Sequence, residues 1–397
     1  MKKLVLISFL LLGGSGLAES VAQIPPFISD STTVSVMTMG PSQVELYTAF
    51  GHSAFRVLDH KTGIDLVFNY GIFSFNQPNF YLNFARGKLL YKLGVNRYED
   101  FKEAYIEENR SIVEQNLNLT VSEKHQLYAF LVENNKPENR DYYYNYIYDN
   151  CATKIRDVLE TVFKDRITFD YSYVTEDLTF RQLMDMNLGQ QPWGDLGIDI
   201  CLGTGIDKVA TGYQYMYLPE YIQKAFAGAT IKRGNSAVPL VSDTEVVFMP
   251  IEEGESQASL VTPTIVFVLV FMLVGFSTQQ EWKAGKRRKW LDFTLFFVVG
   301  VVGMLLLFLW FATDHISQYN FNLLWAFPAH AFVAFYAFKN SPPNWLSVYL
   351  LSAAVLLAIV IVSWSFLPQM LHLALVPIML TIGLRAIFWR KSAIRAS

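Results

Sequence analysis

The amino-acid sequence changes character near residue 258, and this change limits the folds that the chain can adopt. Residues 23–257 are polar and mixed, and they are numerous enough for one substantial domain with its own core. Only 17% of all residues are charged, against about 25% in a typical soluble protein. Each of the five apolar stretches that follow is near the length that a helix needs to cross about 30 Å of hydrocarbon: Ala258–Ser277, Leu291–Ala312, Leu323–Phe338, Leu346–Phe366 and Leu371–Trp389. We therefore expect a polar domain over 23–257 and a five-helix transmembrane domain over 258–397.

The first 22 residues have the pattern of a secretory signal peptide. Lys2 and Lys3 precede an apolar stretch, Val5–Leu17, and small residues with possible cleavage points follow. The apolar stretch is too short to span a bilayer comfortably, which favours cleavage over anchoring. This predicts export of the polar domain.

The basic residues predict the same orientation. They gather in the loop after the first stretch (Lys283, Lys286, Arg287, Arg288, Lys289), at Lys339 and in the C-terminal tail, whereas loops 313–322 and 367–370 contain none. The positive-inside rule then puts the polar domain outside and the C-terminus in the cytoplasm. A net charge of −3 argues against a nucleic-acid partner. Two cysteines cannot build a disulfide framework or a cysteine-rich zinc site.

The polar domain mixes strand and helix patterns. Residues 33–39, 52–59 and 64–70 alternate as strands do, and the last two read as a hairpin. Helical patterns cover 98–110, the segment from the capping box Thr120-x-x-Glu123 to about Asn134, and 151–163, while 238–257 is a strand-containing connector. Asn150 or Asp149 is a natural N-cap for the third helix. Cys151, Ile155, Val158 and Val162 share one face of this helix, which must pack on an apolar surface. The expected fold class is α+β.

Cys151 opens that helix, where unpaired amides and the helix dipole lower the pKa of a thiol. His52, which follows Gly51, is the candidate base. A hairpin centred near Lys61 places residue 52 opposite about residue 70, so Asn69, or as second choice Tyr70, would orient the imidazole. A buried cysteine and a strand histidine are also common as structural residues.

Other polar residues support weaker interpretations. Arg56 and Arg156 could bind a phosphate or carboxylate, although structural ion pairs are the simpler account. Asp314 and His315 lie in a loop at the outer membrane surface, where they could meet a head group or amine or serve only the loop. Cys201 is expected to be a packing thiol, and a Cys151–Cys201 disulfide would abolish the chemistry. The tyrosines between residues 142 and 148 could line an acyl groove, meet the membrane interface or pack beneath the cysteine helix.

The motifs FGHSAFRV and DNCATKIRD resemble the circularly permuted NlpC-type papain-like fold, in which the histidine strand precedes the cysteine helix, as in lecithin:retinol acyltransferase. Together with FNYGIFSF, PWGDLGIDICLG, YMYLPEYI and TDHISQYNFNLLWAFP, they resemble the Lnb family, the Bacteroidota-type lipoprotein N-acyltransferases, over nearly the whole mature chain. The resemblance implies that His52 and Cys151 form the catalytic pair, and it leaves the third member between Asn69 and Tyr70.

This resemblance implies an enzyme of the bacterial inner membrane with a periplasmic catalytic domain. Its acyl donor would be a membrane phospholipid and its acceptor a diacylated lipoprotein, with no metal or other cofactor and no nucleic acid. Two alternatives remain open. One is a membrane-tethered cysteine peptidase or amidase acting on cell-wall peptides, for which a single anchoring helix would suffice. The other is a non-enzymatic binding scaffold, which would keep its function after Cys151→Ser.

Overall fold

The computed structural model describes residues 24–74, 76–251 and 261–396. The predicted signal peptide, residues 1–22, and the predicted domain border at residue 257 lie outside these ranges. The chain divides into two compact units. The first unit holds the described residues up to Asn83, Leu89–Glu176 and those from Thr211 to Ile251; the second holds Phe84–Lys88, Asp177–Ala210 and those from Val261 onward. The division at 257 into two consecutive domains stays a prediction.

The first unit is built on an antiparallel sheet of seven strands in the order β10-β5-β1-β2-β3-β4-β6. The strands are β1 (Thr32–Met39), β2 (His52–Asp59), β3 (Ile64–Ile72), β4 (Leu90–Arg97), β5 (Ile112–Leu117), β6 (Asp141–Tyr143) and β10 (Val241–Phe248). A second sheet joins β7 (Ile167–Thr168), β8 (Thr230–Arg233) and β9 (Ser236–Pro239). The predicted hairpin is confirmed as β2 and β3, which pair from Phe55 with Phe68 to Asp59 with Ile64.

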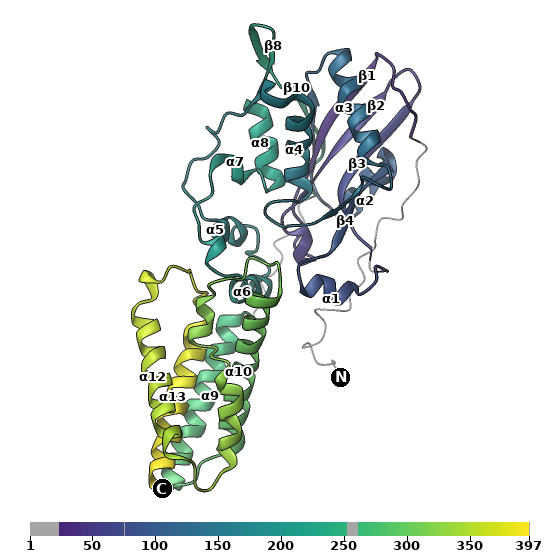
Figure 1. The fold of residues 1–397 in the computed structure, drawn as a ribbon. Coiled ribbons are helices and arrows are strands. Elements are labelled where there is room, and N and C mark those ends of the chain that lie inside the picture. Colours follow the sequence, from purple (N-terminus) through teal and green to yellow (C-terminus); the bar gives the residue numbers. More distant parts are fainter. Residues whose placement is uncertain (1–23, 75, 252–260, 397) are drawn as a thin grey trace. The chain divides into compact units, whose positions relative to one another are not determined.

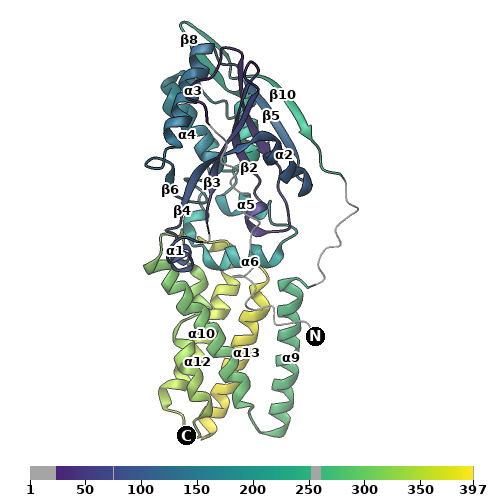
Figure 2. The ribbon, with the colours of Figure 1, turned by 90° about the vertical axis from the view of Figure 1, so that its right-hand side faces the viewer.

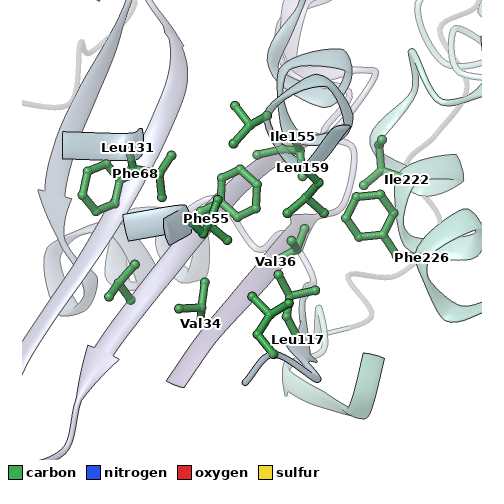
Figure 3. Close-up of a cluster of buried hydrophobic side chains, with 14 of the residues drawn as sticks. Val34, Val36, Phe55, Phe68, Leu117, Leu131, Ile155, Leu159, Ile222 and Phe226 are labelled. Carbon is green, nitrogen blue, oxygen red and sulfur yellow. The ribbon is translucent and has the colours of Figure 1, made fainter. Parts of the chain in front are cut away.

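Helices cover both faces of the large sheet (Figure 2). The face bearing Val36, Phe55 and Phe68 packs against α3 (Val121–Asn134), α4 (Cys151–Phe163) and α8 (Pro219–Gly228). Figure 3 shows the apolar side chains of strands and helices meeting in this core, with Ile155 and Leu159 of α4 beside Phe55. The opposite face packs against α2 (Tyr98–Glu107) through Val67 and Phe101. The smaller elements of this unit are η2 (Leu46–Thr48), α1 (Phe80–Ala85, which continues into the second unit), η3 (Lys164–Arg166) and α7 (Gly212–Tyr215).

Local chemistry accounts for the helix boundaries. Thr120 caps α3 in a capping box with Glu123, and Asn150 caps α4, both as the sequence predicts. The predicted apolar face of α4 is confirmed, because Cys151, Ile155 and Val158 are buried. The mixed α+β class of this unit is therefore confirmed.

The second unit is helical. Its helices are α5 (Phe180–Asp185), α6 (Pro192–Cys201), α9 (Pro263–Ala284), α10 (Lys289–Ala312), α11 (Ala329–Val333), α12 (Asn344–Val362) and α13 (Leu375–Ala396), with the short η4 (Thr204–Ile206), η5 (Phe321–Leu324), η6 (Ala334–Phe338) and η7 (Trp364–Phe366). In Figures 1 and 2, α9, α10, α12 and α13 run side by side, and α13 packs on both α9 and α12.

Among the described residues, four segments are long and apolar enough to cross a membrane: Pro263–Ala284, Lys289–Ala312, Phe321–Phe338 and Asn344–Val362. These correspond to the first four predicted stretches. The third is broken into η5, α11 and η6 around Pro328, which has no backbone N–H to donate to a helix. The fifth stretch corresponds to α13, and its crossing of the membrane stays a prediction.

A buried ion-pair cluster explains how α13 accommodates an arginine. Arg385 is fully buried and binds Glu281 of α9 through two hydrogen bonds of 3.0 Å and Asp292 of α10 at 2.7 Å. Arg287, from the basic loop, also binds Asp292, at 2.5 Å. Removing one partner of such a buried pair is strongly destabilising, because the other charge stays buried. The cluster therefore ties three helices together.

Candidate active site

The thiol of Cys151 lies at the N-terminus of α4, where Asn150 orders the first turn. The side-chain oxygen of Asn150 accepts hydrogen bonds of 2.9 Å from the backbone N–H groups of Ala152 and Thr153. Cys151 is buried and its thiol is free. This places the sulfur at the positive end of the helix dipole, where a thiolate is stabilised.

His52 is the first residue of β2 and reaches the thiol from the sheet. Gly51 precedes it with φ +80°, and a Cβ there would lie 2.8 Å from the carbonyl oxygen of Met39, so the turn requires glycine. The Nε2 atom of His52 lies 2.6 Å from Oδ1 of Asn69, and the ring forms a second hydrogen bond with Cys151. Since Asn69 occupies Nε2, Nδ1 is the nitrogen left for the thiol.

The strand register explains why Asn69 and not Tyr70 meets the imidazole. Continued beyond the pair Phe55 and Phe68, the register sets residue 52 opposite Gly71, one residue further than the sequence suggests. Residues 52, 69 and 71 therefore share a face of the hairpin, because side chains alternate along a strand. Tyr70 points to the opposite face, into the core, and donates a hydrogen bond of 2.5 Å to Asn134. The structure thus brings together Cys151, His52 and Asn69, and it does not bring Tyr70 to His52.

The electrostatics of the pair favour a thiolate and an imidazolium. Burial alone would raise the pKa of Cys151, but the charge and hydrogen bond of His52, with hydrogen bonds from the backbone N–H groups of Ser53 and Ala152, outweigh it and lower this pKa. Burial alone would lower the pKa of His52, but the charge and hydrogen bond of Cys151, helped by Asn69, raise it. The two shifts have one cause, the attraction between the charged forms. Cys151 is therefore equipped as a nucleophile.

Space beside the pair depends on Gly71. This glycine has φ +98° at an irregularity in the pairing of β3 with β4. A Cβ at this position would lie 3.7 Å from Cβ of Cys151 and 3.8 Å from Cε1 of His52. Any side chain at this position would therefore contact both Cys151 and His52.

Two tyrosines, Tyr91 and Tyr144, lie close enough to Cys151 for its charge to act on their hydroxyls. The rings of Tyr91 and Tyr144 stack with centroids 4.1 Å apart. Burial, followed by the charge of Cys151, raises the pKa of both hydroxyls, that of Tyr91 to about 12. The run of tyrosines before α4 was noted in the sequence, but no local signal distinguishes Tyr144 from its neighbours. Tyr105 of α2 stacks on His52 and was also missed.

The two arginines considered as anion ligands are engaged in ion pairs. Arg56 binds Asp65 at 2.7 Å and Glu114 at 2.8 Å. Arg156 binds Asp157 at 2.7 Å and donates to the carbonyl oxygen of Tyr213. Both arginines therefore form the structural ion pairs that the sequence analysis considered the simpler interpretation.

Asp314 and His315 contact the main chain of Phe84–Lys88 within the second unit. The N–H of Asp314 donates to the carbonyl oxygen of Arg86 at 2.8 Å, and Nε2 of His315 lies 3.1 Å from the carbonyl oxygen of Phe84. The Asp314 carboxylate, which is mostly exposed, lies 3.5 Å from Lys88. These contacts hold the loop; a role toward substrate stays a prediction.

One group of side chains in the second unit has the composition of a metal site. Ligand atoms of Asp195, Asp199 and His372 lie within 4.8 Å of one another. However, Nδ1 of His372 accepts a hydrogen bond from the N–H of Ala374, so the neutral ring carries its proton on Nε2, which faces Asp195 at 3.3 Å. The ring therefore donates to the carboxylate and does not offer a lone pair to a metal. Cys201 nearby in the sequence is a free thiol whose pKa burial raises to about 11.

Comparison with known proteins identifies the two parts of the chain. Residues 27–185 match the family model described as the Lnb N-terminal periplasmic domain, and residues 255–396 match the model described as the Lnb transmembrane domain. Searches of curated proteins and of solved structures gave no match. The fold and these matches define a membrane protein with a periplasmic domain and a membrane-spanning helical domain. The chain belongs to the Lnb family, which confirms the resemblance seen in the sequence and indicates an enzyme.

Proposed function

We propose that this protein is a lipoprotein N-acyltransferase that works through a thioester on Cys151. The observation that carries this proposal is the hydrogen-bonded series Cys151, His52 and Asn69, with the thiol at the start of α4 and its pKa lowered. A nucleophile, a base and a group that orients the base are the parts that acyl transfer through a covalent intermediate requires.

In the first half-reaction, the Cys151 thiolate attacks the carbonyl carbon of a phospholipid ester. The tetrahedral oxyanion needs a hydrogen-bond donor, and the N–H of Cys151 itself is the candidate at the start of α4, because Asn150 already accepts from those of Ala152 and Thr153. The carbon–oxygen ester bond breaks, and His52 gives the proton it took from the thiol to the leaving alkoxide. A lysophospholipid departs, and the acyl chain remains on sulfur.

In the second half-reaction, the α-amine of a diacylglyceryl-cysteine attacks the thioester carbonyl. His52 accepts a proton from the amine, the carbon–sulfur bond breaks, and an amide forms on the lipoprotein. The Cys151 thiolate and the His52 imidazolium are restored. Both substrates use one site in turn, so ping-pong kinetics are expected.

The membrane-spanning helices fit the chemistry of these substrates. Both donor and acceptor are held in a bilayer by their acyl chains, and the energy of the acyl ester makes a nucleotide unnecessary. We place the protein in the bacterial inner membrane, with residues 23–257 as the periplasmic catalytic domain and the C-terminus in the cytoplasm. The basic loop Lys283–Lys289 supports this orientation.

The test is intact-protein mass spectrometry of the detergent-purified full chain after incubation with a phospholipid of defined acyl mass. Wild type and the control variant Cys201→Ala should gain one acyl group that hydroxylamine removes, and Cys151→Ala should not. Adding a synthetic diacylated lipopeptide should discharge the adduct and yield the triacylated lipopeptide.

Two results would contradict the proposal. The first is an adduct that persists in Cys151→Ala, which would exclude the Cys151 thioester. The second is a wild-type protein that gains no acyl group with acceptor withheld yet cleaves peptidoglycan peptides, which would make it a peptidase or amidase.

A further inference from the structure

The ring of His52 forms an offset stack with a tyrosine from another element. The rings of His52 and Tyr105 are nearly parallel, with an interplanar angle of 14° and centroids 6.3 Å apart. The two hydrogen bonds of His52, to Asn69 and Cys151, both involve the edge of its ring. The terminal torsion of histidine is broad, so edge contacts alone leave the tilt of the ring weakly fixed. A ring stacked on the face restricts that tilt.

Tyr105 is itself held firmly. It lies on the buried face of α2, where its ring centroid is 4.9 Å from that of Phe101. The guanidinium carbon of Arg110 lies 4.6 Å from the centroid of the Tyr105 ring. Arg110 donates to the carbonyl oxygen of Gly40 at 2.8 Å and binds Glu108 at 3.0 Å, with only 5% of its side chain exposed. Its own N–H donates to the carbonyl oxygen of Tyr105 at 3.0 Å, which fixes the two residues to each other.

We infer that Tyr105 is a positioning residue that, supported by Arg110, holds the imidazole of His52 in the plane from which it meets both Asn69 and Cys151. The inference rests on the proposed role of His52 as the base for Cys151. Neither Tyr105 nor Arg110 needs to touch the substrate for this role. Stacking of aromatic rings and the contact of a guanidinium with a ring face are both favourable, and burial strengthens the second.

The charge of Arg110 gives this arrangement a measurable signature. Burial lowers the pKa of His52, but the charge and hydrogen bond of Cys151 and the hydrogen bond of Asn69 outweigh burial and raise it. The positive charge of Arg110 acts in the same direction as burial and lowers this pKa. Tyr105, the other titratable group against the ring, has a pKa raised by burial and is neutral at physiological pH. Removing the positive charge of Arg110 should therefore move titration of the thiol and imidazole pair to higher pH.

The experiment measures the rate of Cys151 alkylation by iodoacetamide between pH 5 and 9, on the full chain in detergent with Cys201→Ala as background. Tyr105→Leu should slow alkylation at pH 7 about two- to tenfold, the range expected for a lost aromatic stack. Tyr105→Phe, which keeps the ring, should stay near the parent rate. Arg110→Gln should shift the profile to higher pH, whereas Lys102→Gln, which removes a positive charge from α2 itself, should leave it in place.

The outcomes separate this inference from the proposed function. If His52→Ala alkylates like the parent, the proposed base is wrong and the inference fails with it. If His52→Ala is slow but Tyr105→Leu follows the parent profile, only the inference fails. Should Tyr105→Leu not fold, Tyr105→Phe and Arg110→Gln decide: a Phe variant as slow as His52→Ala, or an unshifted Arg110→Gln profile, would overturn the positioning role.

Discussion

Replacing Asn150 by alanine tests how the chain builds the nucleophile. The side-chain oxygen of Asn150 accepts from the N–H groups of Ala152 and Thr153, and its amide nitrogen donates to the carbonyl oxygens of Tyr146 at 2.9 Å and Tyr217 at 2.8 Å. Asn150 is only 5% exposed, so water cannot readily replace these bonds. The substitution removes the cap of α4 and the tie between the start of this helix and two loops.

The expected loss in the free energy of unfolding follows from these contacts. Loss of an N-cap costs about 1 kcal/mol. Each carbonyl oxygen that loses its buried partner adds roughly 1 kcal/mol, the low end for an unsatisfied group. The sum is about 3 kcal/mol, which lowers the unfolding midpoint of a domain of this size by about 6–12 °C. Asn150→Asp keeps the acceptor for the two N–H groups but loses the donor, and its negative charge beside the thiolate should raise the pKa of Cys151.

The assay heats the full chain in detergent, in the Cys201→Ala background, and follows cleavage of the first unit by thermolysin as it unfolds. Thr120→Ala is the matched control, because it removes only the cap of α3 and should lower the midpoint by about 2–4 °C. An Asn150→Ala variant that unfolds no earlier than Thr120→Ala would contradict the stabilising role of Asn150. An Asn150→Asp variant that alkylates with the pH profile of the parent would contradict its electrostatic effect on Cys151.

Three further predictions concern the base, the turn before it and the acidic cluster of the second unit. Asn69→Ala removes a hydrogen bond to the charged form of His52, worth about 1.5–3 kcal/mol, and should slow thioester formation about 10- to 100-fold. The secondary structure measured by circular dichroism should not change, and an unchanged rate would exclude Asn69 as the orienting residue. Gly51→Ala should cost at least about 1–2 kcal/mol and lower the unfolding midpoint of the first unit, because its φ of +80° disfavours any side chain. A midpoint equal to that of the parent would mean that the turn relaxes. Burial and then the charges of Asp199 and Asp195 raise the pKa of Asp185 to about 8, so its protonated form stabilises the fold below about pH 4 and this contribution is lost as the pH rises through about 8. Asp185→Asn should therefore raise the thermal midpoint of the second unit at pH 8.5 and change it little below about pH 4, where Asp185 is protonated in both the folded and the unfolded chain. An equal change at both pH values would show that Asp185 is charged throughout.

The sequence alone determined the elements whose signals are local. Strand β2 and helix α4 have the predicted limits, and the capping boxes and the apolar face of α4 occur where the spacing indicates. Side-chain alternation, caps and helical periodicity depend on residues a few positions apart, so they can be recognised without a fold. The position of Cys151 at a helix N-terminus belongs to this class, and so do the apolar stretches of the membrane-spanning part.

Which side chains contact the imidazole of His52 depends on the folded arrangement of the strands and helices. A shift of one residue in strand pairing exchanges the faces of a strand, so the choice between Asn69 and Tyr70 depended on the register of β2 and β3. Tyr105 reaches His52 from α2, and Arg56 is paired with Glu114 of β5, through contacts that no short sequence pattern encodes. The assignment of Asp177–Ala210 and Phe84–Lys88 to the helical unit likewise follows from packing. Contacts between distant segments depend on how sheets and helices pack as a whole. The candidates for the site could therefore be named from the sequence, but the fold selected which of them meet.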